Sequence, residues 1–261
     1  MWKSLIAKPQ WNLRNRLRAA GIHFALSVAV AILSALLVFV VWYPYPYREI
    51  SGGRELFLIV VAVDIVLGPL LTLAVFDTAK SRGKLRFDLA VIALLQLTGL
   101  AYGLWTVFVA RPVYTVFEYD RFRVVHAVEV PAELMPKALP GLQSLPFTGP
   151  GLLALREFKA GNEKFDMTMA ALQGASLAAQ PELWQPYAEA VPRVLKEAKP
   201  LQALMARLPK DAAALSAAAK AAGRDPQSLV YLPMIGRKTF WTVLLDPITG
   251  AELGFVPVDS F

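Results

Sequence analysis

The sequence of 261 residues has no cysteine and only two histidines, His23 and His126. The lack of cysteine excludes disulfide bridges, thiolate metal sites and cysteine nucleophiles. Neither histidine is tied by spacing to a serine or a carboxylate, and no metal-ligand cluster or glycine-rich nucleotide-binding pattern is present. We therefore predict that the protein is not an enzyme and expect no catalytic residues, no cofactor and no metal ion.

Charged residues are also scarce, at 18% of the chain, whereas 56% of the residues are hydrophobic. The net charge of +7 comes almost wholly from residues 1–110, which contain 11 Lys and Arg against 5 Asp and Glu. Residues 111–261 contain 16 and 15 respectively, so they are close to neutral. Because nucleic-acid binding requires basic residues gathered on a folded surface, we expect no nucleic-acid partner.

Three long hydrophobic runs account for this composition, at residues 21–41, 56–76 and 89–110, and only the second contains a charged residue, Asp64. Each run has the roughly 20 residues that cross the hydrocarbon core of a bilayer as a helix. The first run ends in the aromatic stretch 42–47 rather than in a small-residue cleavage site, which indicates a retained anchor and not a signal peptide. The sequence thus predicts an integral membrane protein that contacts membrane lipid.

Basic residues in the short loops predict the orientation of these spans. Five Lys and Arg precede the first run and four lie between the second and third runs, whereas the first loop has two, balanced by two glutamates. Because Lys and Arg accumulate on the cytoplasmic side, the N-terminus is expected inside and residues 111–261 outside. We expect a basic cytoplasmic segment (1–20), a transmembrane domain (21–110) and a periplasmic domain (111–261) in a bacterial inner membrane.

The extracytoplasmic part reads as a small α+β domain. Residues 112–118 and 121–128 are β-branched and aromatic, which predicts a hairpin, and 131–151 are rich in proline and glycine, which predicts an irregular connection. Residues 152–222 favour three or four short helices, and strands are expected at 229–234, 239–245 and 252–257. Strands at both ends of a helical middle predict one antiparallel sheet.

Five residues of the second and third runs are candidates for a structural or partner-contact role. A carboxylate at Asp64 is costly in a membrane unless it is protonated, paired or hydrated. Two interpretations remain open: a structural contact with Gln96 or Thr98, or a role in binding a partner or an ion. Gly68 and Pro69 predict a kink, and Gly99 and Gly103 form a GxxxG pattern that allows another helix to approach closely.

Several of these stretches resemble the TfpX/TfpZ family of type IV pilin accessory proteins. The similar segments are 41–44, 61–73, 87–96, 102–103, 110–114, 231–233, 244–246 and 249–250. The resemblance implies a non-enzymatic inner-membrane chaperone or assembly modulator that supports pilus biogenesis. It also implies a partner, a type IV major pilin, contacted through its transmembrane helix and its globular head, with Asp64 offering a charge or a hydrogen bond to the pilin.

Two other functions are compatible with parts of the sequence. A membrane-anchored extracytoplasmic sensor has a similar layout, but it predicts a cytoplasmic output domain, and the expected orientation leaves only ~20 residues and a ~12-residue loop inside. A transporter fragment or membrane enzyme would account for Asp64 and the Gly68-Pro69 pair. It lacks an evident repeat and a paired set of reactive groups.

Overall fold

The computed structural model describes residues 12–261 except 160, 173 and 175. Its contacts divide the chain into two compact units. The first unit consists of the chain up to Leu37 and of Glu55–Val107, and the second consists of Val38–Arg54 and Phe108–Phe261. Residues 1–11 of the predicted cytoplasmic segment lie outside the described residues.

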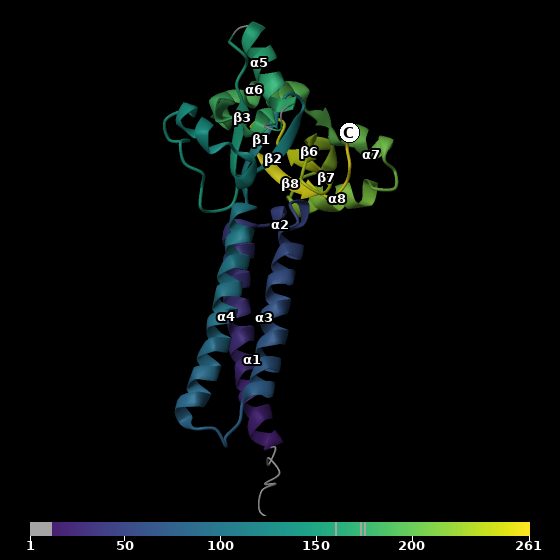
Figure 1. Ribbon diagram of the computed structural model, residues 1–261. Helices are drawn as coiled ribbons and strands as arrows, with labels where there is room; N and C mark the ends of the chain where they lie inside the picture. The colour runs from purple at the N-terminus through teal and green to yellow at the C-terminus, as the bar shows by residue number, and fades with distance from the viewer. Residues whose placement is uncertain (1–11, 160, 173, 175) are drawn as a thin grey trace, which may run out of the picture. The chain divides into compact units, whose positions relative to one another are not determined.

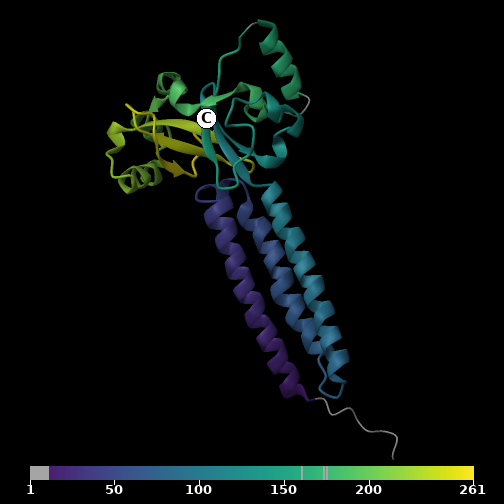
Figure 2. The ribbon, with the colours of Figure 1, turned by 90° about the vertical axis from the view of Figure 1, so that its left-hand side faces the viewer.

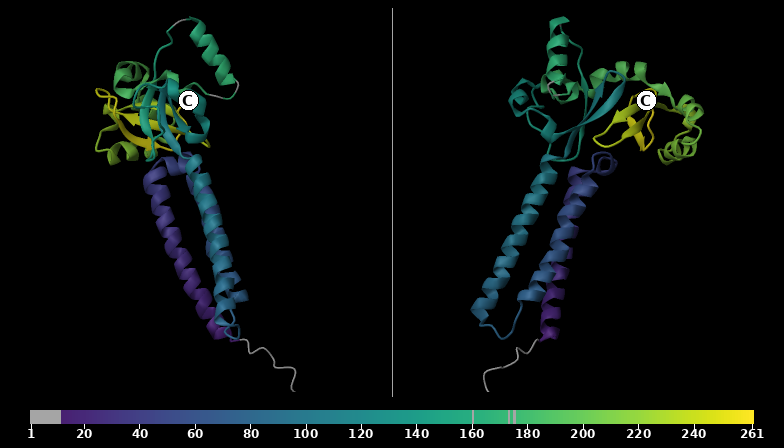
Figure 3. Two further views of the ribbon diagram at one scale, coloured as in Figure 1. Left: turned by 60° about the vertical axis from the view of Figure 1, so that its left-hand side comes forward. Right: turned by 45° about the vertical axis from the view of Figure 1, so that its right-hand side comes forward.

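The first unit is built from long apolar helices that run side by side in every view (Figures 1, 2 and 3). They are α1 (Leu13–Leu36), α3 (Gly53–Val75) and α4 (Arg82–Val109), and α1 continues as a π-helix over Leu37–Trp42. Within the described residues, these three helices are long and apolar enough to cross a membrane. The three predicted helices are therefore confirmed, while their insertion in a membrane stays a prediction from length and hydropathy.

Basic side chains stabilise the ends of α1, α3 and α4 that lie near the connection between α3 and α4. Arg16 of α1 donates to the backbone carbonyl oxygens of Leu73 and Ala74, near the C-terminus of α3. Lys80 donates to the Val75 carbonyl oxygen at 3.0 Å and pairs with Asp88 at 2.7 Å. Carbonyl groups at a helix C-terminus have no partner within the helix, so these cations satisfy them. The basic residues counted for topology thus also have structural contacts.

The second unit contains a sheet of eight strands in the described part of the chain, in the order β4-β3-β1-β2-β6-β7-β8, with β5 paired to β6. The strands are β1 (Pro112–Glu118), β2 (Arg121–His126), β3 (Gly151–Leu155), β4 (Trp184–Pro186), β5 (Lys199–Pro200), β6 (Val230–Ile235), β7 (Phe240–Leu245) and β8 (Glu252–Val256). The expected hairpin is confirmed as β1 and β2, and the three expected C-terminal strands are confirmed as β6, β7 and β8.

The expectation of a purely antiparallel sheet is wrong, because the sheet is mixed. β3 pairs in parallel with β1, and β6 pairs in parallel with β2. A parallel pair needs a long crossover connection. The segment 127–150 supplies one of these connections, and the helical middle of the domain supplies much of the other. The sequence contained the connections, but their length alone does not say which strand each one returns to.

The middle of the domain is helical, as expected, with one correction. In the described residues it contains α5 (Gly161–Leu172), α6 (Tyr187–Glu197), α7 (Leu201–Arg207) and α8 (Ala212–Ala221). Residues 151–155, however, form β3 rather than the start of a helix. Leu and Ala favour helices, but here pairing with β1 on one side and β4 on the other outweighs that preference. Short 3₁₀ helices cover Ala127–Glu129, Ala132–Lys137, Leu177–Ala179, Pro181–Leu183 and Pro226–Ser228.

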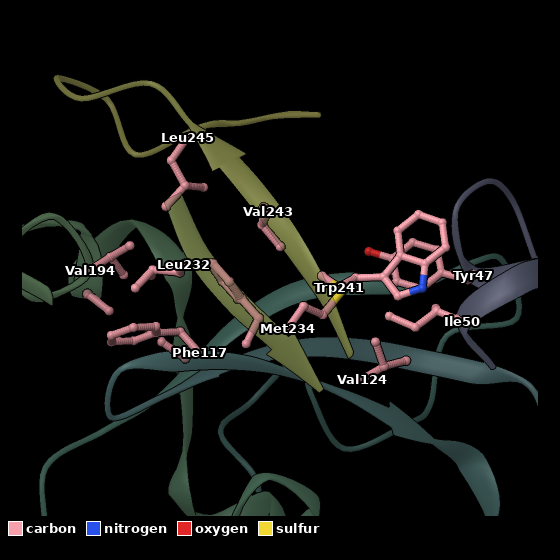
Figure 4. Close-up of a cluster of buried hydrophobic side chains, with 13 residues drawn as sticks. Tyr47, Ile50, Phe117, Val124, Val194, Leu232, Met234, Trp241, Val243 and Leu245 are labelled. Carbon is pink, nitrogen blue, oxygen red and sulfur yellow. The ribbon is translucent and has the colours of Figure 1, made fainter. Parts of the chain in front are cut away.

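A buried cluster between the sheet and its covering elements includes residues from the loop between α1 and α3. The short helix α2 (Tyr47–Ile50) places Tyr47 and Ile50 among strand residues such as Val124, Met234 and Trp241 (Figure 4). Tyr47 is 7% exposed and Ile50 is fully buried. The loop that the sequence assigns to the space between two spans therefore supplies part of the core of the second unit.

Candidate functional site: an apolar groove with a few polar groups among three helices

The first unit has a cavity of about 310 Å³ between its helices. α1, α3 and α4 all contribute side chains to its wall. Most of the wall is aliphatic, and the polar groups in it come from Asp64, His23, Ser27 and Gln96. A mostly apolar cavity with a few convergent polar groups is the usual form of a binding site. This groove is therefore the best candidate for the functional site of the helices.

Asp64 lies in this wall, half-buried on α3. Gln96 of α4 approaches it, but the Gln96 side-chain nitrogen donates to the backbone oxygen of Asp64, at 3.1 Å, and not to its carboxylate. The described residues donate no hydrogen bond to that carboxylate. The expected neighbour Gln96 is thus adjacent, and Thr98 is exposed and does not line the cavity. The carboxylate stays available to a donor that enters the groove.

His23 is held at the wall of the groove by Thr72. Its ring nitrogen Nδ1 lies 2.5 Å from the Thr72 hydroxyl oxygen, which joins α1 to α3. Thr72 is buried, so this contact is shielded from solvent or lipid. The sequence alone identifies His23 only as a histidine inside the first hydrophobic run. A polar residue inside an apolar run was the signal that could have linked His23 to the polar residues of the second run.

The glycines of α3 and α4 differ in their surroundings. Gly68 is buried against Gln96, and a Cβ atom there would lie 2.1 Å from the Gln96 side-chain nitrogen. Gly103 is buried against Val60 of α3, and a Cβ atom there would lie 2.5 Å from a Val60 methyl carbon. Gly99 has nothing within 4 Å of its Cβ position. Only one glycine of the GxxxG pattern therefore serves the contact between α3 and α4.

Pro69 lies inside α3, which runs without interruption from Gly53 to Val75. A proline inside a helix removes one backbone hydrogen bond, so the preceding turn has a carbonyl group to satisfy. The acceptor that Pro69 frees is the carbonyl oxygen of Ile65, which directly follows Asp64, whose own oxygen accepts from Gln96. Gly68, which makes room for Gln96, and Pro69, which frees a backbone acceptor, thus belong to the same local arrangement as Asp64.

The outer surfaces of these helices are open. Only 11%, 17% and 22% of the most apolar windows of α1, α3 and α4 are buried within the protein. Such surfaces must be covered by lipid or by other helices, because large apolar areas are not left in water. The described residues include no group of three or more His, Cys, Asp or Glu able to hold a metal ion. The groove is suited to binding an apolar segment that carries a hydrogen-bond donor or a positive charge.

His126, the other histidine, is fully buried at the end of β2. Its Nδ1 lies 3.1 Å from a carboxylate oxygen of Glu129, and its backbone nitrogen donates to the other oxygen at 3.2 Å. These contacts with His126 hold the pKa of Glu129 below its usual value, against the effect of burial. His126 therefore closes a local turn in the core, and its lack of a catalytic role stays a prediction.

Comparison with known proteins places this arrangement in a family. Residues 11–52 match the family described as fimbrial assembly protein FimB. The "Fimbrial assembly protein, serogroup I" of Dichelobacter nodosus is 36% identical over 94% of this chain and 95% of its own length. The serogroup E1 protein of the same organism is 34% identical over the same shares. The protein of serogroups C1 and C2 is 38% identical over 46% of this chain and 92% of its own length.

No solved structure matches the chain. The resemblance to type IV pilin accessory proteins is confirmed at the level of fimbrial assembly, while the narrower TfpX/TfpZ name stays a prediction. The matches with relatives extend over nearly the whole chain, so they include both the helices that form the groove and the mixed sheet. This chain belongs to the FimB family of fimbrial assembly proteins.

Proposed function

We propose that this protein is a non-enzymatic accessory factor, a chaperone or assembly modulator, that acts on a type IV major pilin in the bacterial inner membrane. Its fimbrial assembly relatives support a role in pilus biogenesis. In this proposal the N-terminus is cytoplasmic, α1, α3 and α4 cross the membrane, and the mixed sheet lies in the periplasm. The basic loops and the length of the three helices support that topology.

The observation that carries the proposal is the groove around Asp64. A pilin subunit before assembly presents an apolar helix in the membrane and a globular head outside it. The groove offers aliphatic walls for such a helix and a carboxylate with no donor from the described residues. An ammonium group or a hydrogen-bond donor on the incoming helix would relieve the cost of that carboxylate in the membrane. The second unit would then contact the head.

Three variants in the native host test this proposal. Asp64→Leu removes the charge and both acceptors, Asp64→Asn keeps one acceptor without charge, and Val63→Leu changes an exposed neighbour outside the groove. We expect pilin co-purification to fall with Asp64→Leu and to stay unchanged with Val63→Leu. Because exchange of a hydrogen-bonded charged group typically costs 1.5–3 kcal/mol, the expected loss for Asp64→Leu is roughly tenfold or more.

The outcomes separate the hypotheses. Retained pili and retained pilin co-purification in Asp64→Leu, at equal levels of the accessory protein, would refute the groove as the pilin site. Unchanged pili and pilin after deletion of the whole gene, in a strain without a second copy, would refute the pilin-directed function. A normal Asp64→Asn variant beside a defective Asp64→Leu variant would assign the contact to hydrogen bonding instead of charge.

A further inference from the structure

Residues 38–54, which join α1 to α3, belong to the second unit. We call them the strap. Tyr47 and Ile50 of the strap lie in the core with strands of the sheet (Figure 4). The Tyr47 hydroxyl lies 2.8 Å from the Thr115 hydroxyl of β1, and its ring packs edge-on against Phe255 of β8. Removal of the strap would therefore open the core between β1 and β8.

Backbone contacts fasten the strap along its length. Gly149 donates to the carbonyl oxygen of Val41 at 2.6 Å, and Lys238 donates to that of Ile50 at 3.4 Å. Gly236, in the turn after β6, leaves no room for a side chain, because a Cβ atom there would lie 2.1 Å from Ile50. The turn between β6 and β7 thus closes directly over Ile50. Small changes in the position of the strap must be taken up by the sheet, because close-packed cores deform little.

An aromatic group fixes the start of the strap. The ring of Trp42 lies 5.1 Å from that of Phe108 and 6.1 Å from that of Phe147. Arg111 stacks over Phe108 at 3.8 Å and donates to the Pro146 carbonyl oxygen at 2.9 Å. The entry of the strap is therefore joined to the residues that lead into β1.

The strap also has defined ends. The boundary between the compact units falls at Leu37 and Val38, where α1 changes from an α-helix to a π-helix. The second boundary falls after Arg54, in the first turn of α3. Short π-helical segments frequently mark functional positions in helices. The strap joins α1 to α3 covalently, and both helices line the groove that contains His23 and Asp64.

From this connection we infer that the strap is a conformational relay: filling the groove shifts α1 against α3, and the strap converts that shift into looser or tighter packing of the sheet core. The inference rests on the proposed function in one respect: it takes the groove as the site where a ligand binds. It does not depend on the identity of the partner. A ligand bound among the helices would thereby change the packing of the second unit.

A buried reporter in the strap tests the relay. Ser51 is 3% exposed and its hydroxyl has no hydrogen-bond partner among the described residues, so Ser51→Cys is nearly isosteric. The chain has no other cysteine. Ser260→Cys is the matched control, since Ser260 is 1% exposed, its hydroxyl is equally unpartnered, and it lies in the same unit outside the strap. The rate of thiol modification by a maleimide then reports how often each site opens.

The groove is filled by mutation, so no partner is needed. Ala31→Phe places a ring in the groove, whereas Ala29→Phe places the same ring on an exposed position of α1 that does not line it. In purified full-length protein in detergent, we expect Ala31→Phe to change the modification rate of Ser51→Cys at least about fivefold, the low end of usual allosteric couplings. Ala29→Phe should leave that rate unchanged, and Ser260→Cys should respond to neither substitution.

Each result decides the question. A change confined to Ser51→Cys supports the relay. An equal change at Ser51→Cys and Ser260→Cys would mean general loosening of the domain and would overturn it, as would no change at either site. Because no pilin is present, a negative result here would leave the pilin-binding result of Asp64→Leu intact, and the reverse also holds.

Discussion

The protonation of Glu252 gives the sharpest test of the core of the second unit. Glu252 is the first residue of β8, and one of its carboxylate oxygens is buried without a partner among the described residues. Burial raises the pKa of Glu252 from the ordinary value of 4.5 to about 7. Burial raises the pKa values of Tyr47 in the strap and Tyr187 in α6, and the negative charge of Glu252 raises them further. We predict that Glu252→Gln stabilises the protein at alkaline pH.

The sign and size follow from proton linkage. The folded state holds the Glu252 proton more tightly than the unfolded state, so its contribution to stability is full below pH 4.5 and is lost as the pH rises through about 7. One pKa unit corresponds to 1.36 kcal/mol, so the ionised carboxylate costs at most about 3 kcal/mol at pH 8. For a domain of this size that cost corresponds to roughly 6–12 °C in the unfolding midpoint.

The assay is thermal unfolding of the full-length protein in detergent from pH 5 to pH 9, followed by near-ultraviolet circular dichroism. Between pH 5 and pH 8 the thermal unfolding midpoint of Glu252→Gln should fall much less than that of the wild type. At pH 8 the variant should be more stable than the wild type. Glu133→Gln serves as the control, since Glu133 is an exposed carboxylate of the same unit. We expect that control to follow the wild-type curve.

One result would refute this reasoning directly. If Glu252→Gln had the same pH dependence as the wild type, the buried carboxylate would have a hydrogen-bonded or hydrated environment and not the apolar one described. A variant less stable than the wild type at every pH would instead show that the carboxyl group makes a contact in the folded state that glutamine cannot replace.

Two further predictions concern packing at single groups. Tyr47→Phe removes the hydrogen bond to the buried Thr115 hydroxyl and should lower the free energy of chemical unfolding by about 1–2 kcal/mol. Tyr45→Phe, at a residue that is 55% exposed, should cost almost nothing. Equal effects of the two substitutions would contradict a core position of Tyr47. Gly103→Ala should loosen α3 against α4, because its Cβ would clash with Val60, and should lower the midpoint of thermal unfolding in detergent. Gly99→Ala should be neutral or stabilising by up to about 1 kcal/mol, and the reverse order would show that Gly99 makes the close contact.

Local patterns predicted the regular elements of this protein well. The hydrophobic runs predicted three helices because a helix makes its backbone hydrogen bonds within its own segment. A long apolar run therefore forms a helix in an apolar environment whatever its neighbours are. The hairpin of β1 and β2 and the strands β6 to β8 followed from β-branched residues separated by turn residues. The strand β3 was missed because its Leu-rich sequence has no such signature, and pairing with β1 decides its conformation.

The candidate site was predicted in part. A carboxylate within an apolar run identifies Asp64 from sequence alone, since its cost in a membrane does not depend on the fold. The contacts around Asp64 were harder to predict from the sequence. Gln96 donates to the backbone oxygen of Asp64 and not to its carboxylate, and His23 is held in the groove by Thr72. These contacts depend on how each helix is rotated about its axis, and helices that are apolar all round carry little periodic signal to fix that rotation.

The sequence by itself determined the three helices, the hairpin, the helical middle and the presence of a carboxylate among apolar residues, because each depends on neighbours along the chain. The tertiary structure alone decided the parallel pairing of β3 and β6, the burial of the strap in the sheet core and the different roles of Gly99 and Gly103. Those features join residues far apart in the chain. Their free energy comes from packing between surfaces that come together only in the folded protein.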